Sequence, residues 1–130
     1  MIRIIGLAVC LLALPAGAAE VGIASVDDGR PTPYDGANYH GRVSTGERFS
    51  AAVLAIAHRT LPLGSWAFVK HGRTGEFARV WDRGPCLTPW CQKHAPLRIR
   101  VRVADLTPRL AKRLGCDGLC KVAIWPVPLP

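Results

Sequence analysis

The 130-residue sequence predicts a small, mainly β domain with a barrel architecture. Short extended segments follow one another, separated by glycine- and proline-containing turns. Only one segment carries both a clear helix start and a clear helix stop. Strands do not alternate with helices, so the rhythm of a parallel α/β fold is missing. There are no internal repeats, and these observations together predict a single small barrel.

Six extended segments account for the expected barrel wall. Most are rich in β-branched or aromatic residues, and turn signals such as the Leu61–Gly64 turn and the His71–Gly75 hairpin loop separate them. Between residues 97 and 103, three arginines alternate with apolar residues, which predicts a half-buried strand with a basic outer face. The six predicted strands are Val21–Ser25, Ala57–Arg59, Trp66–Lys70, Glu76–Asp82, Leu97–Val103 and Lys121–Trp125.

The remaining segments are expected to be one helix, one short helical turn and loops. Thr107 followed by Pro108 is a favoured helix start, and Gly115 is a favoured helix end. Ser50 is expected to cap a short helical turn over residues 51–55. The segments 26–38 and 86–96 are expected to be loops, the second one a surface loop closed by cysteines.

Residues 1–19 are expected to be a cleaved signal peptide. A positively charged start precedes an apolar run over Ile4–Leu14, and small residues follow it. That run is too short and wrongly flanked for a membrane span. We expect cleavage after Ala18 or Ala19, and residues 20–130 to form an exported domain that is periplasmic or secreted.

Four cysteines follow the predicted signal peptide. An even number of cysteines in a small exported domain indicates disulfides, and four allow three connectivities. The local pairs Cys86–Cys91 and Cys116–Cys120 are the first choice, and cross-pairing of the two loops stays open. Neither pair has the two-residue spacing of a zinc knuckle, so we expect no metal.

The charge balance indicates an anionic partner outside the cell. The sequence holds 17 basic and nine acidic residues, a formal net charge of +8. In an exported protein such a charge favours cell-wall or membrane polyanions over nucleic acid. The alternative is that the charge only keeps a small protein soluble.

Asp82, at the end of the fourth predicted strand, is the first candidate for chemistry. Strict alternation places Ala78, Val80 and Asp82 on one apolar face, where a carboxyl group is poorly solvated and suits a general acid. The alternative is a turn cap, in which Asp82 accepts backbone N–H bonds from Gly84 and its neighbours.

Five motifs occur in an order that resembles a known family. They are Gly22–Ser25, His40–Phe49, Ala57–Gly64, Asp82–Pro85 and Asp105–Thr107. This set resembles the rare lipoprotein A family of double-psi β-barrels, which is related to expansins and barwin-like domains. The resemblance implies a six-stranded double-psi barrel with one or two short helices. It also implies an endolytic lytic transglycosylase that cuts peptidoglycan glycan strands and leaves 1,6-anhydro ends, without a cofactor.

The resemblance implies that Glu47, His58 and Asp82 are the catalytic residues. In lytic cleavage the sugar's own C6 hydroxyl attacks the anomeric carbon, so one protonated carboxylic acid can donate to the glycosidic oxygen and then accept the hydroxyl proton. We assign that role to Asp82. Glu47 would hold substrate hydroxyls or stabilise the oxocarbenium charge, and His58 would bond to Asp82 or the substrate. The alternatives are a structural histidine and a glutamate in a solvated turn. Asp105 is interpreted as a structural residue at the helix start.

Three further residues are expected to bind substrate. Arg59 and Arg83 flank His58 and Asp82, and Trp90 offers an aromatic face on which a sugar can stack. We expect a monomer that associates peripherally with the cell wall and binds peptidoglycan strands. The alternative function is an expansin-like module that grips wall glycan without cutting it.

Overall fold

A computed structural model describes residues 17–30 and 41–128 of the chain. Most of the predicted signal peptide and most of the expected loop at residues 26–38 lie outside these ranges.

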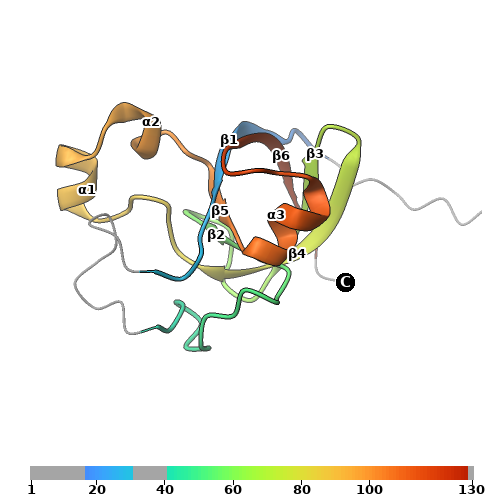
Figure 1. Ribbon diagram of the computed structural model, residues 1–130, viewed down its shortest axis with the longest axis horizontal. Helices are drawn as coiled ribbons and strands as arrows, with labels where there is room; N and C mark the ends of the chain where they lie inside the picture. Colours follow the sequence, from blue (N-terminus) through green and yellow to red (C-terminus); the bar gives the residue numbers. More distant parts are fainter. Residues whose placement is uncertain (1–16, 31–40, 129–130) are drawn as a thin grey trace, which may run out of the picture.

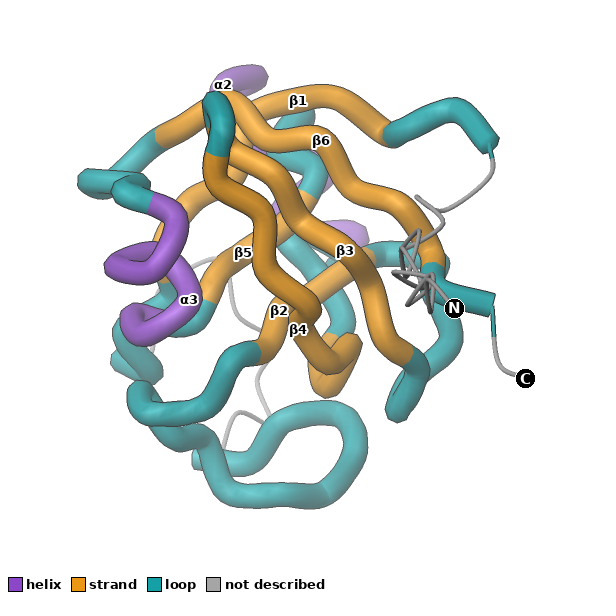
Figure 2. Tube along the Cα trace, turned by 90° about the vertical axis from the view of Figure 1, so that its right-hand side faces the viewer, coloured by secondary structure: helices purple, strands orange, loops and turns teal. Residues whose placement is uncertain are grey.

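Six strands close into a barrel in the order β1-β5-β2-β4-β3-β6 (Figures 1 and 2). The β1/β5 and β2/β4 pairs are parallel, and the other four pairs are antiparallel. Because every strand is paired on both sides, the sheet has no open edge. The prediction of a mainly β, six-stranded barrel is confirmed. The strands are β1 Glu20–Val26, β2 Ala55–His58, β3 Trp66–His71, β4 Thr74–Asp82, β5 Ala104–Leu106 and β6 Cys120–Pro126.

Small and β-branched side chains fill the barrel. Its fully buried members include Ile56 of β2, Val80 of β4 and Leu106 of β5. Burying each such side chain contributes roughly 1.5–3 kcal/mol, which is the main force that holds the strands around one core. A separate small cluster of Val43, Ala55 and Trp81, with Phe49 packed against it, lies outside this core.

Helix α3, Pro108–Leu114, covers the barrel beside β4 and buries Leu110, Ala111 and Leu114. It begins and ends where the sequence predicted. Gly115 adopts the left-handed conformation at the C-terminal cap, with φ of 70°. The Thr107 side chain does not cap the helix, because its hydroxyl is used across the fold. It donates to the Val53 carbonyl and accepts from the Ala55 amide at 3.3 Å.

Three short helices are present in the described chain, where one or two were expected, and two of them lie between β4 and β5. Helix α1, Pro89–His94, occupies the expected surface loop. Thr88 caps it, accepting from the Cys91 amide at 3.1 Å. This Thr-Pro start is the same signal that correctly predicted α3. Figure 1 shows α1 and α2 to one side of the barrel and α3 toward the other.

The predicted strand over Leu97–Val103 is wrong. Residues Leu97–Arg100 form helix α2, and the next strand begins only at Ala104. The apolar alternation was misleading because just one of its members is buried. Ile99 packs into a cluster with Cys86, Cys91 and Ala95, while Val101 is 54% exposed. Near Ser50 the expected helical turn is a tight turn without a helix, in which Ser50 Oγ accepts from the Ala52 amide at 3.3 Å.

Candidate active site

A bulge in β4 turns Asp82 away from the barrel core. Along the parallel β2/β4 pair, Ile56 is in register with Val80 and Ala57 with Asp82, so Trp81 is an extra residue. Partners in register share a face of the sheet. Asp82 therefore lies on the face of Ala57, opposite to that of Val80. The prediction that Ala78, Val80 and Asp82 share one face is wrong at Asp82, because the bulge interrupts the alternation.

Four residues in register run across the outer face of the barrel wall. Asp82 of β4 is beside Ala57 of β2, Ala57 is beside Asp105 of β5, and Asp105 is beside Ser25 of β1. We call these four residues the carboxylate row. Their chain neighbours Ala24, Ile56 and Leu106 belong to the barrel core, so the row itself faces outward. Two aspartates thus flank one alanine on the same surface.

The Asp82 carboxylate is held through one of its two oxygens. Oδ1 accepts from the Ser44 amide at 2.9 Å, the Ser44 hydroxyl at 2.6 Å and the Arg83 amide at 2.9 Å. Among the described residues no hydrogen bond reaches Oδ2. Asp82 is therefore a turn cap at Oδ1, while Oδ2 stays available for chemistry. The donors are Ser44 and Arg83 and do not include Gly84, and the role of Asp82 as a general acid stays a prediction.

Glu47 lies on the loop that also supplies Ser44. Its Oε1 accepts from the Thr45 hydroxyl at 2.9 Å and forms an ion pair with Arg79 Nη1 at 2.6 Å. The Thr45 amide in turn donates to the Trp81 carbonyl at 3.1 Å. The loop is thus docked on the bulged end of β4, which brings Glu47 and Asp82 to one region. Sequence reasoning did not single out Ser44, Thr45 or Arg79.

His58 lies on the other side of the wall. It follows Ala57 in β2, is in register with the core residue Ala104, and is 2% exposed. Its Nδ1 accepts from the Thr60 and Leu61 amides at 3.1 and 3.0 Å, so the ring proton is on Nε2 and donates to Glu20 Oε2 at 2.6 Å. Both ring nitrogens are engaged, and neither bonds to Asp82.

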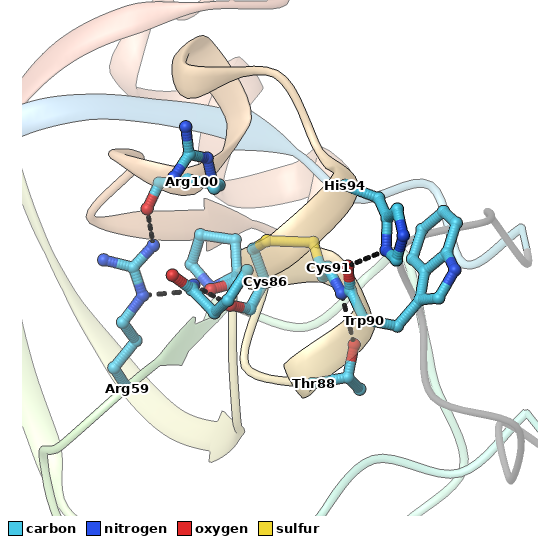
Figure 3. The surroundings of a disulfide bond; sticks show 9 residues. Arg59, Cys86, Thr88, Trp90, Cys91, His94 and Arg100 are labelled. Atoms are coloured by element: carbon cyan, nitrogen blue, oxygen red, sulfur yellow. Dashed lines mark hydrogen bonds between the residues drawn. A yellow bond between two sulfur atoms is a disulfide. The ribbon is translucent and has the colours of Figure 1, made fainter.

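Arg59 and Arg83 hold the turn after β4 in place. Arg59 donates from Nε to the Pro85 carbonyl at 3.0 Å and from Nη2 to the Arg100 carbonyl (Figure 3). Arg83 Nη1 donates to the carbonyls of His58 and Leu61. At Gly84 the backbone has φ of 131°, which residues with a side chain rarely adopt. These contacts fix the path of the chain between Asp82 and the α1–α2 segment.

Trp90 extends the candidate site onto α1. Its side chain is 49% exposed and stacks on His94, with ring centroids 4.9 Å apart (Figure 3). The Cys86–Cys91 disulfide closes the base of this helix, and the Cys116–Cys120 disulfide joins the end of α3 to β6. The structure thus forms both local pairings and not the cross-pairing.

Two negative findings concern the described residues. Within residues 17–30 and 41–128 no three His, Cys, Asp or Glu side chains are grouped as a metal site. None of the helices in those ranges is long and apolar enough to cross a membrane.

The closed six-stranded barrel, with its two parallel pairs, is a double-psi β-barrel in class, and its candidate site is acidic. No protein-family model matches the chain. Three curated proteins do, and each carries the name endolytic peptidoglycan transglycosylase RlpA, qualified as probable for the first two. The Synechocystis protein is 35% identical over 94% of this chain, the Nostoc protein 36% over 64%, and the Salmonella typhimurium protein 30% over 87%.

On these similarities the chain belongs to the RlpA-like family. It spans 38%, 20% and 25% of the lengths of the three relatives, in the same order. The similarity therefore covers one part of each of these longer proteins.

Proposed function

We propose that this chain is an endolytic peptidoglycan lytic transglycosylase. It would cut the bond between N-acetylmuramic acid and N-acetylglucosamine and leave a 1,6-anhydro end. The names of the three relatives support this activity. The observation that carries the proposal is Asp82, which faces outward with Oδ1 held by three donors and with Oδ2 unbonded among the described residues.

Asp82 would act as the general acid. A proton on Oδ2 passes to the glycosidic oxygen as the bond to C1 breaks, and the C6 hydroxyl oxygen of the same sugar attacks C1. The three donors at Oδ1 fix the direction in which Oδ2 presents that proton. Such preorganisation is what positioned catalytic groups require.

Glu47 and His58 would have different tasks. Glu47 is 44% exposed on the docked loop, so it can receive substrate hydroxyls or stabilise positive charge on the sugar. His58 is buried and bonded on both nitrogens, so we assign it a positioning role. It holds the turn at Thr60 and Leu61. The Leu61 carbonyl accepts a hydrogen bond from Arg83, the residue that follows Asp82.

Substrate contacts would continue along the α1 side of the site. Trp90 is 49% exposed and aromatic, which suits stacking with a sugar ring, and the guanidinium groups of Arg59 and Arg83 suit carboxylates of the wall. The positive net charge favours the anionic cell wall, and we propose no nucleic-acid partner, cofactor or metal. The protein would act as a monomer at the periphery of the wall.

We also propose that residues 1–19 direct export and that residues 20–130 are the working domain in the periplasm or outside the cell. Two disulfides in so small a chain fit an oxidising compartment. The first strand begins at Glu20, next to the proposed cleavage positions.

The test is mass spectrometry of peptide-stripped glycan strands after incubation with the oxidised protein. New fragments that end in 1,6-anhydro-N-acetylmuramic acid are the expected result. If the protein sediments with wall sacculi yet creates no new ends, the expansin-like binding module replaces this proposal.

A further inference from the structure

We infer that Asp105 is a second catalytic carboxylate, which accepts the proton of the attacking C6 hydroxyl. This inference builds on the proposed function and divides between two residues the tasks first assigned to Asp82 alone. Asp105 is the other acidic member of the carboxylate row.

The strand register places the two aspartates on one surface. Ala57 is in register with Asp82 on one side and with Asp105 on the other, so both carboxylates leave the sheet on the face of Ala57. Two inter-strand spacings put their Cα atoms about 9.5 Å apart. Glycosidases that use two carboxylates hold the carboxyl groups roughly 5–9.5 Å apart, and aspartate side chains on Cα atoms at this spacing can reach such a separation.

Asp105 also lies beside the turn that follows Asp82. Its Oδ2 is 4.0 Å from the position that a Cβ on Gly84 would occupy. No side chain stands on Gly84 to separate Asp105 from that turn. Gly84 also permits the φ of 131° that this turn requires.

A buried serine orients Asp105. Ser25 is 6% exposed, and its hydroxyl donates to Asp105 Oδ1. Asp105 itself is only partly buried. The arrangement parallels that of Asp82, in which Ser44 donates to Oδ1. In both residues a serine fixes Oδ1, and Oδ2 is the oxygen we assign to proton transfer.

The proton balance of the step is complete with these two residues. Asp82 gives its Oδ2 proton to O4 of the departing N-acetylglucosamine, which keeps the electron pair of the broken C1–O4 bond. O6 of N-acetylmuramic acid forms the new bond to C1 and loses its proton to Asp105. One proton thus moves from Asp82 to Asp105, and exchange with water restores both groups before the next cycle.

The experiment compares kcat and KM of Asp105→Asn with wild type on peptide-stripped glycan strands, by counting anhydro ends. Positioned acid–base groups contribute about 10²–10⁴-fold to rate. We expect kcat to fall at least about 100-fold with KM nearly unchanged, and the acid limb of the pH–rate profile to shift or vanish. Ser25→Ala leaves the Asp105 carboxylate in place but removes the hydroxyl that orients it, and its kcat should fall about tenfold or less. Asp117→Asn, on an exposed loop, is the matched control for charge.

Thermal unfolding of each variant separates catalysis from folding. If Asp105→Asn does not fold, Asp105→Glu carries the test, because it keeps the charge and the acceptor but displaces the base. A drop in kcat of at least tenfold with unchanged KM supports the inference. Folded Asp105→Asn, or Asp105→Glu where the former does not fold, with kcat within threefold of wild type overturns it. A wild-type protein that makes no anhydro ends overturns the proposed function instead.

Discussion

The two disulfides close loops of nearly equal length, yet their removal should have unequal effects. Their sequence separations are five and four residues. The chain-entropy relation gives each of them about 2 kcal/mol. On loop length alone, replacing either pair by alanines would lower the unfolding temperature by the same amount, roughly 8–16 °C for a domain of this size.

The packing of the sulfurs predicts a difference. Cys116 and Cys120 belong to the barrel core, where they join α3 to β6, whereas Cys86 and Cys91 belong to the separate cluster of the α1–α2 segment. Removing the Cys116–Cys120 disulfide should therefore lower the global unfolding temperature by roughly the full 8–16 °C. Removing the Cys86–Cys91 disulfide should open α1 locally, with a global loss of less than half as much.

Circular dichroism melts and hydrogen exchange of α1 check this pair of expectations. The double variants are Cys116→Ala/Cys120→Ala and Cys86→Ala/Cys91→Ala. Each removes two sulfur atoms from the wild-type protein, so each serves as the control for the other. Equal losses of unfolding temperature, or a larger loss from the Cys86–Cys91 pair, would refute the assignment of the two disulfides to independent packing units.

Three other predictions concern single side chains. Ser44→Ala removes one of three donors to Asp82 and should lower kcat about 5- to 30-fold, equivalent to about 1–2 kcal/mol, while Ser44→Thr keeps the hydroxyl and most of the rate; equal rates in both would contradict the role of this bond. Gly84→Ala should destabilise the fold by about 1–3 kcal/mol in urea unfolding, because its φ of 131° suits only glycine. Leu110→Ala empties a fully buried position and should cost about 2–5 kcal/mol in the same assay, against less than about 0.5 kcal/mol for the exposed Leu119→Ala.

Local signals in the sequence were sufficient for much of the fold. Extended runs between turns predicted five of the six strands, with shifted ends, and the Thr107-Pro108 and Gly115 signals predicted α3. The disulfide pairs followed from their short spacing. Each of these features depends on neighbouring residues, which is why a single sequence reveals them.

The errors came from features that depend on distant partners. The bulge at Trp81 is seen only in the register of β4 with β2, and no local sequence pattern indicates it. The strand prediction at residues 97–103 failed because Ile99 is buried by the Cys86–Cys91 cluster instead of the barrel. The helix α1 was missed for a different reason, because Thr88-Pro89 is a local helix-start signal that the loop prediction for residues 86–96 did not use.

The candidate site could be predicted in composition but not in arrangement. The sequence and its family resemblance pointed to Glu47, His58 and Asp82, and their roles remain proposals. The sequence did not reveal that His58 faces the core and bonds to Glu20, or that Ser44 holds Asp82. It also did not place Asp105 in register with Ala57, because that proximity depends on the order of strands around the barrel.

The proposed lytic activity is tested most directly at Asp82 itself. Anhydro ends would be counted by mass spectrometry after equal amounts of wild type, Asp82→Asn and Asp117→Asn have acted on peptide-stripped glycan strands. Asn keeps the acceptor that Ser44 and Arg83 bond, so the fold should persist while the transferable proton is lost. We expect abundant new ends from wild type and Asp117→Asn, and at least about a 100-fold loss from Asp82→Asn. Wild-type yields from Asp82→Asn would show that Asp82 is not the general acid.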